Sequence, residues 1–242
     1  MKNKRKTLLI LCGIMLFAIV LLYSCKAVEE WNRRGIFEDI MAGDFSAVQG
    51  LDAKKMHELE YVYTRMEEDG RLSWIECDIN EDDQKELLMI ESLQNGRGSV
   101  VAGIFMTKGS RCTRILWDVV DYGSCYYLVE NMIIQYSENH GLGMRYCYVK
   151  YEIDSEGKMT PFKRFEIIDI SEKDDIAIGL IERGFADSGT YYVVTDYEKD
   201  DDASETETKL SREEWMAEFH SEIGDYETVN LKIMAHETEN TQ

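Results

Sequence analysis

Residues 72–91 decide the fold class, and they read Leu72-Ser-Trp-Ile-Glu-Cys77-Asp-Ile-Asn-Glu-Asp-Asp-Gln-Lys-Glu86-Leu-Leu-Met-Ile-Glu91. Two short runs of strand-forming residues flank an acidic segment, and neither run has helical spacing. From Ala53 to Glu68, by contrast, apolar residues recur mostly at intervals of three, as on one face of a helix. The change of period near Arg71 therefore marks the passage from helices to a β region.

Downstream of this stretch the sequence predicts a series of short strands. Glycine-containing turn signals separate several of them, as at 95–98, 108–110 and 154–157. Short strands joined by tight turns pair antiparallel, so we expect an α+β fold with an antiparallel β-meander or half-barrel. The expected strands are Leu72–Cys77, Glu86–Glu91, Val100–Thr107, Cys112–Val119, Ser124–Glu130, Met132–Tyr136, Met144–Ile153, Phe162–Ile168 and Tyr191–Asp196.

Helices are expected on both sides of the β region. The first covers Ala27–Met41, and the second covers Ala53–Glu68 with Asp52 as its N-cap. Ser211 and Glu214 have the spacing of a capping box, which predicts a helix over Arg212–Glu222 that Gly224 ends.

Three further segments complete the prediction. Residues 176–181 fit either a short helix or a loop. The run from Lys199 to Lys209 is an expected acidic loop, and Tyr226–Met234 is an expected edge strand. The organisation is then a membrane segment over 1–25, a helical pair over 26–70, an antiparallel β region over 71–198, and an acidic loop, helix and tail over 199–242. Residues 26–242 are expected to form one domain.

The N-terminus predicts attachment to a membrane. Four cations within residues 2–6 precede Thr7–Cys25, a run of 19 residues without a charge. As a helix, this run is about 28 Å long, close to the thickness of a bilayer core. Because basic residues stay on the cytoplasmic side, residues after about 25 are expected on the extracytoplasmic side of the cell membrane.

Two forms of this anchor stay open. The sequence Leu22-Tyr-Ser-Cys25 resembles the lipobox of bacterial lipoproteins, and the resemblance implies lipid attachment at Cys25 after cleavage. Tyr23 departs from that family, which prefers a small or β-branched residue there. The apolar run is also long enough to remain as an uncleaved signal anchor.

The charge of the chain limits its partners. The formal net charge is −20, with 47 acidic against 27 basic residues. Such a field repels phosphate backbones, which argues against nucleic acid as a partner. It suits cations, basic partners or simple solubility.

Four cysteines lie beyond the apolar run: Cys77, Cys112, Cys125 and Cys147. An even number in an oxidising compartment permits disulfides. Their strand-like surroundings also suit free thiols that pack as small apolar residues. Because no two of them are closely spaced, the sequence contains no zinc motif.

The acidic segment between the first two strands is the candidate metal site. Asp78, Asn80 and Asp82 occupy alternate positions of a short loop, and Glu86 stands four residues further on. Oxygen side chains at alternate positions can converge on a hard cation such as Ca²⁺. The loop is not an EF-hand, because its sixth position is Asp83 and its twelfth is Met89. The competing interpretation is a polar connection between two strands.

The spacing Asp-x-Asn-x-Asp-x-x-x-Glu-Leu over residues 78–87 resembles the calcium loop of FG-GAP (VCBS-type) repeats. It is also similar to a group of uncharacterised lipoproteins of Gram-positive bacteria, which share the lipobox, a helical start, one such loop, a β-meander and a late helix. The resemblance implies that Asp78, Asn80, Asp82 and Glu86 ligate the metal. Asp83 stands where the calcium loop has glycine.

No residues point to catalysis. The four histidines, His57, His140, His220 and His236, are scattered, and no serine or cysteine lies in a nucleophile-elbow pattern. Tyrosines crowd the middle strands and fit either a core or a surface that stacks on a ligand. They are Tyr122, Tyr126, Tyr127, Tyr136, Tyr146, Tyr148 and Tyr151.

Taken together, these features favour a membrane-anchored extracytoplasmic binding or interaction module rather than an enzyme. Its partner would be a protein or a small molecule, and Ca²⁺ could stabilise it. Two rivals stay open. One is an extracytoplasmic hydrolase with a dispersed active site, and the other is a structural or regulatory subunit of an envelope complex.

Overall fold

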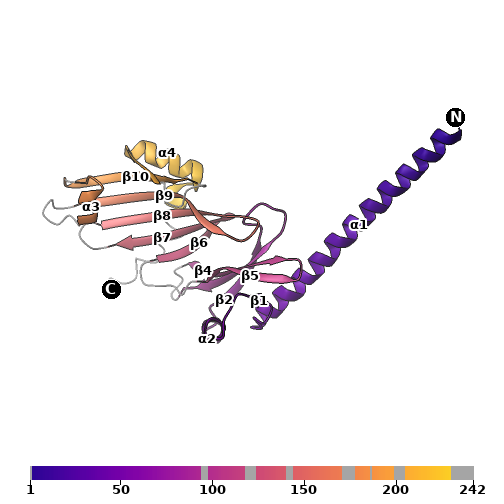
Figure 1. The fold of residues 1–242 in the computed structure, drawn as a ribbon. Helices are drawn as coiled ribbons and strands as arrows, with labels where there is room; N and C mark the ends of the chain where they lie inside the picture. The colour runs from indigo at the N-terminus through magenta and orange to yellow at the C-terminus, as the bar shows by residue number, and fades with distance from the viewer. Residues whose placement is uncertain are drawn as a thin grey trace. The chain divides into compact units, whose positions relative to one another are not determined.

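The computed structural model describes residues 2–93, 98–117, 124–139, 144–170, 178–185, 187–198 and 205–229 (Figure 1). Side chains of the first helix are described from Ile14 onward. The chain divides into two compact units. One contains residues 1–60 and 107–113, and the other contains residues 61–106 and 114–242.

Helix α1 of the first unit is a single helix over Lys2–Met41. The sequence predicted a helix from Ala27, but the apolar run before it has no proline and continues the same helix. Gly35 does not interrupt it. The helix ends where Gly43 takes φ 84°, and the Gly43 N–H donates to the Ile40 carbonyl at 3.0 Å.

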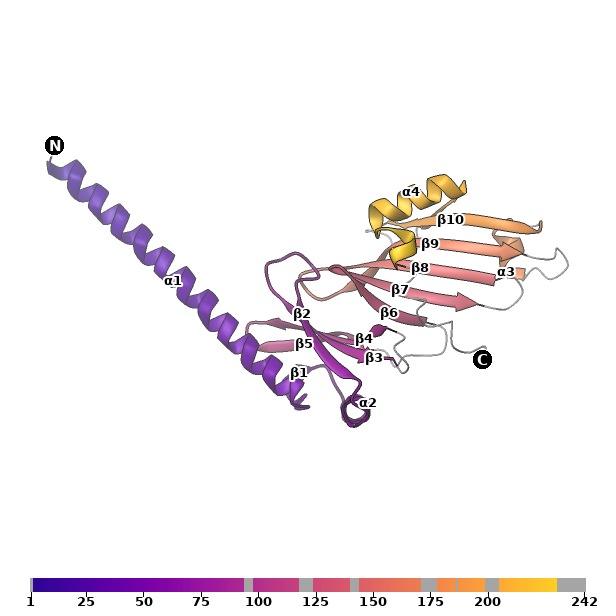
Figure 2. The same cartoon turned by 180° about the vertical axis from the view of Figure 1, so that it is seen from behind.

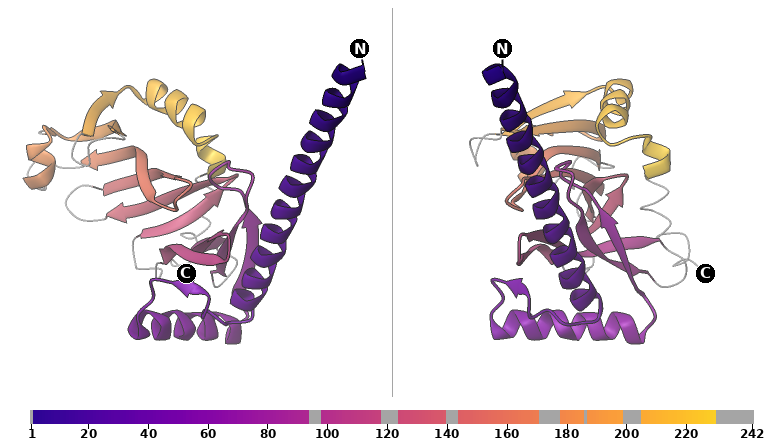
Figure 3. Two further views of the ribbon diagram at one scale, coloured as in Figure 1. Left: turned by 45° about the vertical axis from the view of Figure 1, so that its right-hand side comes forward. Right: turned by 90° about the vertical axis from the view of Figure 1, so that its right-hand side faces the viewer.

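Helix α2 covers Ala53–Glu68, as predicted. The Lys55 N–H donates to Asp52 Oδ1 at 2.8 Å, which confirms Asp52 as its N-cap. Gly70, at φ 65°, ends the helix, and the Arg71 N–H donates back to the Met66 carbonyl at 2.8 Å. Both views of Figure 3 show α2 as one straight helix.

The first sheet has the strand order β1-β5-β4-β3-β2. The short strand β1 (Val48–Gln49) pairs with β5 in parallel, and β2 and β3 pair antiparallel from Leu72↔Glu91 to Cys77↔Glu86. The remaining bounds are β2 Leu72–Cys77, β3 Glu86–Ser92, β4 Ser99–Lys108 and β5 Arg111–Trp117.

The second sheet has the order β11-β10-β9-β8-β7-β6, so each strand lies beside its neighbours in sequence. Its strands are β6 Ser124–Val129, β7 Met132–Asn139, β8 Met144–Ile153, β9 Met159–Ile170, β10 Gly189–Tyr197 and β11 Glu205–Leu210. Helices α3 (Ile178–Glu182) and α4 (Arg212–Glu222) accompany this sheet.

The α+β class is confirmed, but the strands form two separate, mostly antiparallel sheets, and the described strands close no barrel. The prediction for the run 199–209 was wrong in part, because Glu205–Leu210 is a strand. Its alternating threonines and charged residues have the period of a strand, and its register with β10 runs from Tyr192↔Leu210 to Tyr197↔Glu205. Residues 199–204 lie outside the described ranges.

Two smaller predictions are also corrected. The segment 226–229, expected in an edge strand, is helical, and the Val229 N–H donates to the Asp225 carbonyl at 2.9 Å. The rest of that expected strand lies outside the described residues. The ambiguous segment 176–181 is helical from Ile178, where the description begins.

Helix α4 covers one face of the six-stranded sheet. Its capping box is present: the Glu214 N–H donates to Ser211 Oγ at 3.2 Å, and the Ser211 N–H donates to Glu214 Oε2 at 2.9 Å. Trp215 and Phe219 are fully buried, and the ring centroids of Phe165 and Trp215 lie 5.7 Å apart. Trp215 Nε1 also donates to the Val193 carbonyl at 3.1 Å.

Helix α3 covers part of the opposite face, as Figures 1 and 2 show from the two sides. Phe185, just after α3, is buried with Ile168, Val193 and Leu180. A third apolar cluster joins the two sheets within the second unit: Leu88, Ile90, Val101, Ile104 and Leu116 from the first, with Ile133 and Ile153 from the second.

Candidate functional site

The candidate cation loop connects β2 to β3. Asp78 follows the last residue of β2, and Glu86 is the first residue of β3. Cys77 and Glu86 are direct cross-strand partners, so the two ends of the loop are held together by the sheet. Asp78, Asn80 and Asp82 are half-buried, whereas Glu86 is completely buried.

Side-chain oxygens organise the loop by accepting from its own backbone. Asp78 accepts from the Asp82 N–H at 3.2 Å through Oδ1 and from the Asp83 N–H at 3.1 Å through Oδ2. Asp82 Oδ1 accepts from the Gln84 N–H at 2.8 Å. Asn80 Nδ2 donates to Asp82 Oδ2 at 3.2 Å, which brings these two predicted ligands into contact.

Two residues of the loop have left-handed backbone conformations. Glu81 has φ 57° and Asp83 has φ 67°. Aspartate tolerates this region better than most residues, which explains how Asp83 can stand where the calcium loop has glycine. The loop therefore makes the sharp turns that such a site needs.

Glu86 is the residue that a polar connection explains least. Its Oε2 accepts from the Ile79 N–H at 2.9 Å, but Oε1 is buried without a hydrogen-bond partner among the described residues. Burial raises the pKa of Glu86 to about 7, and the nearby carboxylates of Asp82 and Asp78 contribute to this rise. A cation beside Oε1 would satisfy this oxygen and offset the repulsion.

The four predicted ligands are close in space without converging on one point. No group of three His, Cys, Asp or Glu side chains in the described part of the chain is arranged to hold a metal ion. Binding a cation at this loop would thus require Asp78 and Asp82 to exchange backbone hydrogen bonds for metal contacts.

A second charged cluster, around Glu166, was not predicted from the sequence. Glu166 of β9 is 2% exposed on the face of the sheet opposite α4. Arg183 Nη2 donates to its Oε2 at 2.5 Å, Arg164 Nε lies 3.2 Å from the same oxygen, and Arg145 Nε lies 3.7 Å from Oε1. The alternation of Arg164 and Glu166 shows that they share a face, but Arg145 and Arg183 come from other elements.

The remaining predicted residues are dispersed. His57 on α2 and His220 on α4 are exposed, while His140 and His236 lie outside the described residues. Cys25 is exposed within the unbroken helix α1. The sequence predicted no catalytic residue.

The described cysteines beyond α1 are thiols rather than disulfides, and they are Cys77, Cys112, Cys125 and Cys147. Burial raises the pKa of Cys112 to about 12 and that of Cys147 to about 11, which makes both poor nucleophiles. Cys77 Sγ donates to Asn131 Oδ1 at 3.2 Å, and this contact links β2 to the turn between β6 and β7.

The tyrosines divide between the two faces of the second sheet. Tyr127, Tyr136 and Tyr148 are buried in the cluster beneath α4, which favours their interpretation as core residues. The rings of Tyr126 and Tyr151 lie 5.9 Å apart, and both residues pack against the cluster that joins the two sheets. Tyr146 is half-buried at the edge of the α4 cluster, and Tyr122 lies outside the described ranges.

Among the residues that the structure describes, no helix is both long and apolar enough to cross a membrane. Comparisons of the chain with protein-family models, with curated proteins and with solved structures find no match.

Proposed function

We propose that this chain is a membrane-anchored binding or interaction module, with the second unit on the extracytoplasmic side and a divalent cation at the β2–β3 loop. The observation that carries the anchor is the exposure of apolar side chains all around α1. The large apolar residues between Ile14 and Tyr23 are 47–73% exposed. Water is a poor solvent for so many adjacent apolar side chains, whereas lipid is a good one.

The sequence around these residues supports the same proposal. The exposed segment belongs to the uncharged run Thr7–Cys25, and the cations of residues 2–6 precede it on the same helix. This order favours a cationic end in the cytoplasm with the rest of the chain outside. Lipid attachment at Cys25 and a retained signal anchor both give this location.

Extraction of membranes at alkaline pH tests the anchor. The full chain should stay in the membrane pellet, and added protease should digest the second unit in cells without a wall. Recovery of the chain in the soluble fraction would contradict the proposal. Labelling with a radioactive fatty acid, in the natural chain and in Cys25→Ala, then separates the two forms. The lipoprotein is labelled in the natural chain and unlabelled in Cys25→Ala, whereas the signal anchor is labelled in neither.

The cation is supported by the fully buried Glu86, whose Oε1 has no described hydrogen-bond partner, and by the two left-handed residues of the loop. The oxygen-only ligand set of Asp78, Asn80, Asp82 and Glu86 fits a hard cation such as Ca²⁺. Here the cation would hold β2 and β3 together at the end where Cys77 contacts Asn131.

A further inference from the structure

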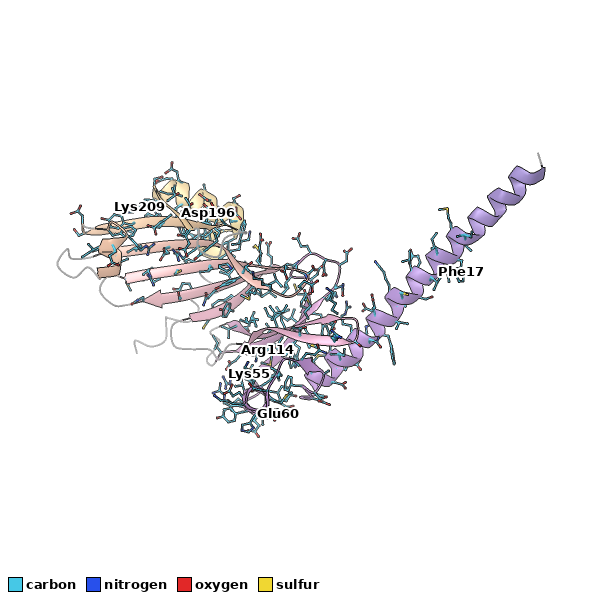
Figure 4. All side chains as sticks on the ribbon, in the orientation of Figure 1. Phe17, Lys55, Glu60, Arg114, Asp196 and Lys209 are labelled. Carbon is cyan, nitrogen blue, oxygen red and sulfur yellow. The ribbon has the colours of Figure 1, made fainter. Side chains whose placement is uncertain are left out.

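Helix α1 carries an apolar stripe that continues past the expected end of the membrane segment. Within residues 26–41, the large apolar side chains exposed on the surface are Val28, at 57%, and Trp31, at 76%. Stepping back from Val28 by four and three residues in turn reaches Ser24, Leu21, Phe17 and Ile14, of which the last three are also exposed. Figure 4 shows Phe17 projecting from α1.

Alternating steps of three and four residues place the stripe on one side of the helix in the pattern of a coiled coil. Small residues border the stripe at Ala18, Cys25 and Ala27, and small residues allow two helices to approach closely within a membrane. The stripe therefore has the sequence features of a helix–helix interface both inside the expected bilayer and just outside it.

The opposite side of α1 is already occupied. Arg33, Phe37 and Ile40 are buried, and their heptad positions lie away from the stripe. One side of the helix is thus covered by the protein, whereas Val28 and Trp31 are exposed on the other side. Lipid can cover Phe17 and Leu21, but the stretch after Lys26 extends beyond the expected membrane segment.

We propose that the stripe Ile14–Trp31 of α1 binds the same stripe of a second copy of this chain, in a parallel dimer. The inference rests on the uncleaved form of the proposed membrane anchor, because cleavage before Cys25 would remove Ile14, Phe17 and Leu21. Two uncleaved chains inserted in the same direction present their helices in parallel. The exposed parts of the five apolar stripe residues amount to on the order of 600 Å² per chain, close to the roughly 800 Å² that each partner buries in a standard interface.

Charges beyond the stripe fit a parallel pair. Arg34 and Asp39 occupy flanking heptad positions from which one helix contacts the other, so Arg34 of each copy faces Asp39 of the second copy. Gly35 and Glu38 take the next two positions of the stripe and end it, which confines the apolar contact to residues up to Trp31.

Cysteine cross-linking in membranes tests this dimer. Val28→Cys, Trp31→Cys and the control Glu29→Cys would each be made in the full chain with Cys12 and Cys25 replaced by serine. All three positions are exposed, and the replacement of Cys25 removes the lipid-attachment site, so the chain is tested with its leader in place. Copper phenanthroline should give a disulfide-linked dimer at positions 28 and 31 at least about fivefold more than at 29.

Equal cross-linking at the three positions, or none at 28 and 31, would overturn the dimer. Alkaline extraction of the same membranes reports separately on the anchor, so the two proposals can fail independently. As a second test, the double variant Val28→Glu, Trp31→Glu should sediment as a monomer in detergent with the thermal unfolding of its second unit unchanged. A double variant that stays dimeric would also refute the inference.

Discussion

Adding calcium should raise the thermal stability of the protein through the β2–β3 loop. Glu86 Oε1 has no hydrogen-bond partner among the described residues, and burial, with a smaller contribution from Asp82 and Asp78, raises the pKa of Glu86, so a bound cation would relieve both costs in the folded state. The carboxylates of Asp78 and Asp82 accept hydrogen bonds from backbone N–H groups, so we expect a calcium affinity at the weak end of the range for calcium-binding sites. A dissociation constant of about 0.1 mM is typical of such extracellular sites.

The size of the effect follows from mass action. At 10 mM free calcium, a site with this affinity stabilises the folded state by about 2.7 kcal/mol. For a domain of roughly 200 residues, this corresponds to a rise of about 5–11 °C in the unfolding midpoint. Differential scanning fluorimetry at pH 8, where Glu86 is mostly ionised, would measure the midpoint in calcium and in EGTA.

Two variants make this prediction specific. The double substitution Asp78→Asn, Asp82→Asn keeps side-chain acceptors for the loop backbone but removes two charges from the site, so the calcium response should disappear. Asp154→Asn is the matched control, because Asp154 accepts from the Glu156 and Lys158 N–H groups in another turn. A natural chain without a shift at 10 mM, or a loop variant that retains it, would refute the reasoning.

Four further predictions concern stability. Burial raises the pKa of Glu86 to about 7 from 4.5, so its stabilising contribution is complete below about pH 4.5 and is lost as the pH rises through 7. In urea titrations without calcium, the free energy of unfolding of Glu86→Gln should be about 3 kcal/mol higher than that of the natural chain at pH 8 and equal to it at pH 4. Ser211→Ala removes the cap of α4 and should cost about 1 kcal/mol by the same titration. Glu166→Ala leaves the arginines around it without their shared carboxylate and should cost about 3–5 kcal/mol, whereas Glu205→Ala, at a half-exposed position, should cost less than about 1 kcal/mol. Glu130→Gly should raise the free energy of unfolding by about 1 kcal/mol, and with it the thermal midpoint, because residue 130 has φ 56°, which glycine adopts without steric strain. A lowered midpoint would show that contacts of the Glu130 side chain matter more than the backbone conformation.

Local signals predicted much of the fold. Asp52 and Gly70 bracket α2, and the capping box of Ser211 and Glu214 gives both ends of α4 together with Gly224. These elements follow from side chains that satisfy backbone groups a few residues away, so their information is contained in short stretches of sequence.

The rest depended on contacts between distant segments. Glu205–Leu210 looks like a solvated loop because it is acidic and polar, but it pairs with β10 and its Glu207 contacts Arg183. The division into two sheets could not be predicted from strand lengths, because it depends on which faces bury Ile133 and Leu88 together. The spacing of the cation loop was visible in the sequence, whereas the complete burial of Glu86 required the fold.

The place of α4 in the chain has a consequence for biogenesis. Trp215 and Phe219 lie in the cluster under α4 and also contact Tyr226, so the strands of this sheet, which are synthesised before α4, complete their packing only when α4 is present. Until the ribosome has synthesised this segment, Tyr148 and Phe165 lack their ring partners from α4. If the chain is exported while it is still being translated, as the proposed anchor implies, this cluster would therefore complete its packing only after α4 had crossed the membrane.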